Sequence, residues 1–108
     1  GAKVTGISLK QDKNSKHFES LKLKQLIRDL RFDICDYSKL NKVIITYKPD
    51  FVFHLAAQSL VLRSYKEPLK TWKTNVFGTL NLIESLNPNI KCEKILDLCC
   101  GSGVLLNT

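Results

Sequence analysis

Three short stretches of the chain hold polar residues whose types and spacing could do chemistry. They are residues 33–36 (Asp-Ile-Cys-Asp), 54–58 (His-Leu-Ala-Ala-Gln) and 75–79 (Asn-Val-Phe-Gly-Thr). The first two each stand at the end of an apolar run of strand length. Because open α/β sheets bind ligands outside the carboxyl ends of their strands, these two stretches are candidates for a ligand site.

Each stretch also has a purely structural interpretation. An Asp at a strand end is commonly a helix cap or a turn former, which suits Asp33. His54, at the end of an apolar run, is typical of a buried, hydrogen-bonded core histidine rather than a catalytic one. Asn75 and Gly78 inside a helix cost stability unless they form hydrogen bonds or pack closely, and an ordinary exposed Asn is the alternative for Asn75.

The cysteines do not indicate a metal site. Four of them, at 35, 92, 99 and 100, form no Cys-x-x-Cys pair and have no His at zinc-finger spacing. Free buried thiols are therefore expected. Cys99 and Cys100 are neighbours whose side chains would point to opposite faces of a strand, which argues against a bridge between them.

The size and composition are those of one soluble globular domain. The 108 residues are 44% hydrophobic and 25% charged, and no apolar run approaches the ~20 residues of a membrane helix. A cytoplasmic protein without a membrane partner is expected, and the start at Gly1, without Met or leader, suggests an excised edge. The net charge of +7 comes from scattered Lys residues, with one short cluster at 10–16, so no nucleic-acid partner is expected.

Hydrophobic periodicity predicts the elements of the first half. A strand over 3–9 leads into a Lys-rich loop, helical turns follow around Phe18, Leu21 and Leu23, and a second strand ends at 33–36. A helix with Ser38 as N-cap runs to Tyr47 and is stopped by Pro49.

The second half alternates in the same way. The continuous apolar run 51–56 predicts a parallel strand that is covered on both faces, followed by a loop over 57–67. Pro68 is placed as the first residue of a helix to about 87, whose apolar stripe comprises Leu69, Trp72, Val76, Phe77, Leu80, Leu82 and Ile83. A last strand covers 93–98. Strand–helix alternation predicts an α/β fold, a doubly wound, Rossmann-like parallel sheet in three layers.

Taken together, 33–36, 54–58 and 75–79 resemble motifs of the extended short-chain dehydrogenase/reductase family. The similarity is greatest to its sugar-nucleotide 4,6-dehydratases of the CDP-glucose 4,6-dehydratase type. Residues 1–90 fit the family pattern in order and spacing, and 50–86 is the most specific block. The resemblance implies one truncated NAD(P)-binding Rossmann-like domain over 1–108, with a divergent tail from 91.

The resemblance also implies the site. Asp33 and Ile34 would meet the adenine of a dinucleotide, and Asn75 would support the site from behind the strand. The small residues after His54 would let the cofactor approach the backbone, so the implied cofactor-lining residues are Leu55, Ala56 and Ala57. The implied nucleotide-sugar side, for a CDP-glucose-like ligand, comprises Gln58, Arg63 and Ser64. NAD is the implied cofactor, and NADP stays open because no acidic residue follows the strand near Ile7.

Two parts of the family pattern are not among these residues. The glycine-rich phosphate loop would precede Gly1 and the Tyr-x-x-x-Lys pair would follow the last residue. Four residues after Tyr37, Tyr47 and Tyr65 come Asn41, Phe51 and Leu69, so no catalytic residue is assigned. The chain is therefore expected to be a dehydratase fragment, inactive alone and of low stability. Alternatives are a weak nucleotide-binding module and a homodimer or partner surface on helix 68–86.

The C-terminal residues resemble something else. Residues 95–103, Ile-Leu-Asp-Leu-Cys-Cys-Gly-Ser-Gly, are similar to motif I of class I S-adenosylmethionine-dependent methyltransferases, which suggests a fusion remnant. Since only 104–108 follow, S-adenosylmethionine is not expected as a cofactor, and Leu106 at the third glycine position excludes a dinucleotide fingerprint. Strand 94–98 is expected beside 51–56, or alternatively in the central slot of the missing first strand. Pairing with 51–56 alone would exclude that alternative.

Overall fold

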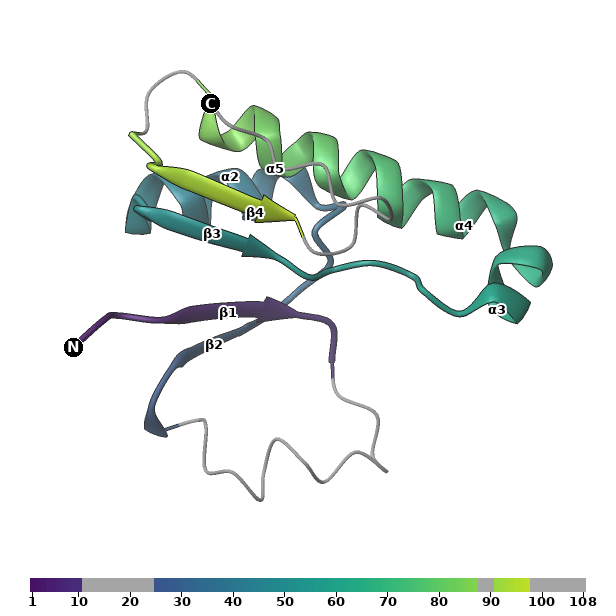
Figure 1. Cartoon of the computed structure of the whole chain (residues 1–108), viewed down its shortest axis with the longest axis horizontal. Coiled ribbons are helices and arrows are strands. Elements are labelled where there is room, and N and C mark those ends of the chain that lie inside the picture. The colour runs from purple at the N-terminus through teal and green to yellow at the C-terminus, as the bar shows by residue number, and fades with distance from the viewer. Residues whose placement is uncertain (11–24, 88–90, 98–108) are drawn as a thin grey trace. The chain divides into compact units, whose positions relative to one another are not determined.

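The computed structural model describes residues 1–10, 25–87 and 91–97, which belong to two compact units, Gly1–Asp33 and Ile34–Thr108 (Figure 1). The first unit contains strands β1 (Thr5–Ser8) and β2 (Arg28–Arg31). The elements of the second unit are α2 (Tyr37–Tyr47), β3 (Phe51–His54), α3 (Val61–Lys66), α4 (Pro68–Trp72), the π-helical turn η2 (Lys73–Phe77), α5 (Gly78–Leu86) and β4 (Lys94–Asp97). The expectation of a single domain stays a prediction.

The first unit is a parallel strand pair. Thr5 lies opposite Arg28 and Ser8 opposite Arg31 in the register of β1 and β2, as the two predicted strands require. The Arg31 guanidinium joins the strand ends, because it donates to Ser8 Oγ at 2.6 Å and to the Asp29 carboxylate at 2.9 Å. The helical turns expected around Phe18, Leu21 and Leu23 lie outside the described residues.

Helix α2 begins two residues earlier than its predicted cap implies. Its N-cap is Asp36, whose Oδ1 accepts from the Lys39 backbone N–H at 3.2 Å, so the assignment of Ser38 as N-cap is wrong. Asp and Ser are both good N-cap residues, and the hydrogen bond from the Lys39 N–H identifies Asp36 as the cap. The helix ends as predicted: Lys48 is left-handed, with φ 45°, and its N–H donates to Ile44 O at 2.8 Å, immediately before Pro49.

Strands β3 and β4 form the sheet of the second unit. They are parallel, with Phe51 opposite Lys94 and His54 opposite Asp97. Among the described residues β4 pairs with β3 alone, as expected for the position beside 51–56 and not for the central slot. Each unit contains one parallel strand pair, and the second unit adds the helices, which confirms the α/β fold class.

Strand β3 is not covered on both faces, contrary to the prediction from its apolar run. Phe51 and Phe53 are 54% and 65% exposed, whereas Val52 is half-buried and His54 is 5% exposed. Alternate side chains of a strand point to opposite faces. Within the described residues, one face of β3 is therefore packed and the other is open.

A long helix follows a short one that the sequence did not reveal. Residues 61–66, expected as part of a loop, form α3, because Ser64 N and Arg63 N both donate to Leu60 O. Pro68 opens α4 at its first turn, as predicted, and α4, η2 and α5 continue as one helical rod to Leu86 (Figure 1).

The core of the second unit lies where α2 and α5 pack together. Leu40 and Ile44 of α2, Leu82 and Leu86 of α5 and Ile95 of β4 are at most 9% exposed. Of the stripe predicted on the long helix, only Leu82 is in this core. Val76 is half-buried, and Leu69, Trp72, Phe77, Leu80 and Ile83 are exposed. None of the helices in the described ranges is long and apolar enough to cross a membrane.

Candidate functional site

The loop after β3 is fastened to the long helix by the side chain of Asn75. Its Oδ1 accepts from the Gln58 backbone N–H at 2.7 Å, and its Nδ2 donates to the Gln58 carbonyl at 3.1 Å. The amide therefore satisfies both backbone groups of Gln58, as a neighbouring strand would. Asn75 is not the ordinary exposed helical Asn of the alternative interpretation.

The side chain of Gln58 bends back onto its own loop. Its Oε1 accepts from Leu60 N at 2.8 Å, while Nε2 donates to Leu60 O at 3.0 Å and to Thr71 Oγ1 at 3.3 Å. These bonds fix the turn that leads into α3. That Gln58 faces a nucleotide sugar stays a prediction.

The loop that precedes α2 is attached to the same helix. Asn81 Nδ2 donates to the Ile34 carbonyl at 3.1 Å, and Cys35 Sγ donates to the Lys73 carbonyl at 3.4 Å. A Cβ on Gly78 would contact Ile34 Cδ1 and would come within 2.8 Å of Ile34 Cγ1. Gly78 is thus required because Ile34 packs directly on the helix backbone, as its position inside a helix indicated.

The π-helical turn η2 contains Asn75 of the first attachment and Lys73 of the second. In η2 the N–H of Gly78 donates to the carbonyl of Lys73, five residues earlier. A π turn is uncommon and is frequent at functional sites. It gave no signal in the sequence, because only the hydrogen-bond register distinguishes it from the α-helix on either side.

His54 is buried and hydrogen-bonded, as predicted from the residues around it. Its Nε2 lies 2.9 Å from Thr79 Oγ1, and the Thr79 hydroxyl also donates to the Asn75 carbonyl at 2.8 Å. Because a hydroxyl carries one proton, both contacts are hydrogen bonds only if His54 Nε2–H is the donor. No buried side-chain polar atom in the described part of the chain is left without a partner.

Leu55, Ala56 and Ala57, the expected cofactor-lining residues, occupy the open stretch between these bonds. Leu55 is 61% exposed, and the two alanines are half-buried. Asp33, at the end of the first unit, is exposed. Whether these side chains touch a cofactor stays a prediction.

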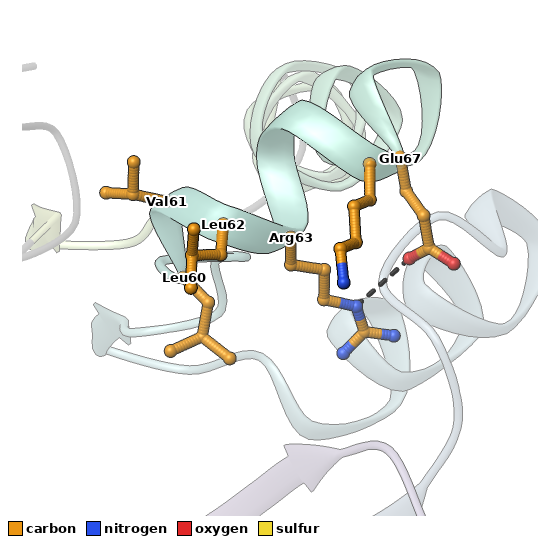
Figure 2. A pocket seen from close by; sticks show the side chains of 6 residues that line it. Leu60, Val61, Leu62, Arg63 and Glu67 are labelled. Carbon is orange, nitrogen blue, oxygen red and sulfur yellow. Dashed lines mark hydrogen bonds and ion pairs between the residues drawn. The ribbon is translucent and has the colours of Figure 1, made fainter.

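Arg63 and Ser64, expected to face the substrate, lie on α3. Arg63 Nε pairs with Glu67 Oε2 at 3.0 Å, and Ser64 Oγ donates to Val61 O at 2.6 Å. Figure 2 shows Arg63 reaching toward Glu67 at one side of a hollow of about 560 Å³, with apolar side chains at the other. The residues that line it are Leu60, Val61, Leu62, Arg63, Lys66 and Glu67.

Two carboxylates near the loops are held ionised by cations. The hydrogen bond from Arg63, with Lys70 Nζ at 3.7 Å, lowers the pKa of Glu67 below its usual range. Hydrogen bonds from the Lys39 side chain and backbone lower the pKa of Asp36 in the same way. The residues that the structure describes contain no cluster of three or more His, Cys, Asp or Glu side chains able to hold a metal ion.

Comparison with known proteins defines the class of this chain. Residues 1–98 match the family described as GDP-mannose 4,6 dehydratase. The CDP-glucose 4,6-dehydratase of Salmonella typhimurium is 42% identical over 93 residues, which is 84% of this chain and 26% of the relative. The UDP-glucose 4-epimerase of Mycoplasma genitalium is 47% identical over 55 residues, 51% of this chain and 16% of the relative.

Similar solved structures support the same class of protein. A UDP-glucose 4-epimerase from Thermotoga maritima with UDP-glucose superposes with a TM-score of 0.73 at 27% identity, over 90% of this chain and 29% of that one. The Thermus thermophilus UDP-glucose 4-epimerase in complex with NAD gives a TM-score of 0.61 at 28% identity, over 66% and 22%. The fold and loops thus define a Rossmann-like segment of the nucleotide-sugar dehydratases and epimerases.

The chain belongs to the GDP-mannose 4,6 dehydratase family, within the extended short-chain dehydrogenases/reductases, and is similar to CDP-glucose 4,6-dehydratase. This confirms the family inferred from the three motifs. The chain spans about a quarter or less of the length of these curated relatives. Of the methyltransferase-like residues 95–103, those from 98 onward, with Cys99 and Cys100, lie outside the described residues.

Proposed function

We propose that this chain is a cofactor-binding segment of a nucleotide-sugar 4,6-dehydratase. In this proposal NAD lies against Ile34 and the backbone of 55–57, with Asn75 supporting the site, and the role of Asp33 stays a separate prediction of the family resemblance. The nucleotide sugar lies on the side of Gln58, Arg63 and Ser64. NAD supplies the hydride acceptor when bound, and the protein binds and orients it.

The observation that supports the proposal most is the attachment of two loops to one helix. Asn75 holds Gln58, and Asn81 and Gly78 hold Ile34, all within the second unit. These are the loops on which the family resemblance places the cofactor. A ligand pocket needs such fixed loops, because ordering them at the moment of binding would weaken affinity.

The residues of this chain can hold a cofactor and cannot complete the reaction by themselves. None of the three tyrosines has a lysine four residues later, so the tyrosine acid/base of the family is not supplied by these 108 residues. His54 does not replace it in this proposal, because its ring is buried and its Nε2 is bonded to Thr79. We therefore expect binding without turnover.

Thermal unfolding with and without ligand tests the proposal. A ligand that binds only the folded state stabilises it by RT ln(1 + [L]/Kd), so 5 mM NAD with a Kd near 1 mM gives about 1 kcal/mol. For a domain of this size that is a rise in Tm of roughly 4–8 °C. S-adenosylmethionine and CDP-glucose, each at the same concentration, serve as comparison ligands.

A pair of matched variants locates the effect. Ala57→Leu places a bulky side chain where the cofactor would approach the backbone, and Ala2→Leu makes the same change in the exposed N-terminal segment. We expect NAD to stabilise the Ala2→Leu protein and not the Ala57→Leu protein. A folded wild-type chain whose Tm does not respond to 5 mM NAD, or responds only to S-adenosylmethionine, would contradict the proposal.

We also propose, as a second function, that the long helix is a pairing surface. Exposed aromatic side chains favour it, since Trp72 is 65% and Phe77 57% exposed. Trp72→Lys should convert a dimer to a monomer in sedimentation experiments, whereas Phe53→Lys, at an equally exposed 65% position on β3, should not. A wild-type chain that remains monomeric at high micromolar concentration would rule this function out.

A further inference from the structure

One helical turn holds both ends of the loop 55–57. At the start of the loop, His54 Nε2 bonds to Thr79 Oγ1 at 2.9 Å. At its end, the Gln58 backbone bonds to the Asn75 side chain at 2.7 and 3.1 Å. Asn75 and Thr79 are four residues apart on the helix, so they lie on the same face.

The two attachments are also joined to each other. The Thr79 hydroxyl donates to the Asn75 carbonyl at 2.8 Å, which leaves its oxygen free to accept from His54. His54 Nε2–H therefore donates to Thr79 Oγ1, and the Thr79 hydroxyl donates to the Asn75 carbonyl. His54 is 5% exposed, so a lost bond to Thr79 would leave a buried donor unpaired.

We propose that His54 and Thr79 are positioning residues for the loop 55–57, acting through Asn75 and the Gln58 backbone. The inference rests on the proposed function in that this loop is the expected NAD contact. His54 and Thr79 themselves do not touch the ligand. They fix the distance between the end of β3 and Gln58, and with it the path of the backbone that NAD would approach.

Substitutions of Thr79 test the inference on the whole 108-residue chain. Thr79→Val keeps the shape of the side chain and removes the hydroxyl, while Thr79→Ser keeps the hydroxyl. The matched control is Ser85→Ala, because Ser85 also lies on α5, is more deeply buried than Thr79, and its Oγ donates to the carbonyl four residues earlier, at 2.7 Å. Among the described residues, the Ser85 hydroxyl bonds to the Asn81 carbonyl of its own helix and not to the loop 55–57.

The readout is amide hydrogen exchange of Gln58 relative to Ile44, a core residue of α2. We expect Thr79→Val to raise the Gln58 to Ile44 rate ratio about tenfold, Thr79→Ser to restore it, and Ser85→Ala to leave it unchanged. Local opening changes this ratio, whereas a general loss of stability raises both rates together. An unchanged ratio in Thr79→Val, or an equal rise in Ser85→Ala, would overturn the proposal.

A measurement on the unaltered pair covers the case in which Thr79→Val does not fold. His17→Gln leaves His54 as the single histidine, and ¹⁵N NMR of its ring at pH 8 reports the tautomer. We expect the proton on Nε2; a proton on Nδ1 would overturn the inferred order of donors. Neither readout needs a ligand. A failure of NAD to bind would therefore count against the proposed function alone, and the exchange ratio would still decide the positioning role of His54 and Thr79.

Discussion

The side-chain amide of Asn75 pairs with both backbone groups of Gln58, accepting from its N–H at 2.7 Å and donating to its carbonyl at 3.1 Å. A side chain on a helix thus provides what a strand would provide at the end of β3. The pairing holds the loop 55–57 open to solvent and in one conformation, which is the property that a cofactor-binding loop needs.

Loss of this pairing should be visible in stability. Asn75→Ala removes two hydrogen bonds at an exposed site and gains some helix propensity, so we expect a net loss of about 1 kcal/mol in urea unfolding. Asn81→Ala, which removes one bond to Ile34, should cost less. An Asn75→Ala protein as stable as wild type would mean that water replaces the amide without loss.

Gly78→Ala should destabilise the chain although alanine is the better helix former. Propensity alone predicts a gain of about 1 kcal/mol. The new Cβ would meet Ile34, within 2.8 Å of its Cγ1, and overpacking of this kind costs roughly 1–3 kcal/mol. In a double-mutant cycle, Ile34→Ala should remove the penalty, and additive effects of the two substitutions would contradict this packing.

The N-cap of α2 should make stability depend on pH. Hydrogen bonds from Lys39 lower the pKa of Asp36, so its contribution is present above the unfolded value near 4 and is lost as pH falls through the folded value. Asp36→Ala should lower the Tm at pH 7 and by less at pH 3. Ser38→Ala, at the position that the sequence favoured, should leave the Tm almost unchanged at both.

Cys92 should be an unreactive thiol at neutral pH. Burial, with the nearby Asp50 and Glu93 carboxylates, raises the pKa of this thiol, and only the thiolate is nucleophilic. Peptide mapping by mass spectrometry should find Cys92 alkylated much more slowly in the folded chain than in urea at pH 7.5. Equal rates would show that the Cys92 segment is open in solution.

Much of the architecture follows from the sequence because its signals are local. Pro49 ends a helix and Pro68 starts one through the geometry of the proline ring, and both boundaries are confirmed. The choice between Asp36 and Ser38 as cap was wrong because both residue types cap helices and the hydrogen bond is not visible in the sequence. Helix α3 was missed because Leu60, Val61 and Leu62 have no helical period.

The sequence indicated candidate site residues but not the contacts that hold them. His54 was expected to be buried and bonded, but its partner Thr79 is 25 residues away in the sequence and no periodicity links them. Asn75 and Gly78 were informative because each is costly inside a helix, whereas Thr79 and Asn81 are unremarkable there. Phe51 and Phe53 belong to an apolar run and are nevertheless exposed. An apolar run indicates that burial of its side chains would be favourable, but it does not show that another element covers them.

The most direct test of the central claim is a ¹H–¹⁵N NMR titration of the chain with NAD. The account predicts saturable shifts of the amide signals of Ile34, Leu55, Ala56 and Ala57 at millimolar NAD, with smaller changes in α2. If the chain is folded and these four amide signals do not shift at several millimolar NAD, or if the shifts centre on other residues, the result would contradict the account.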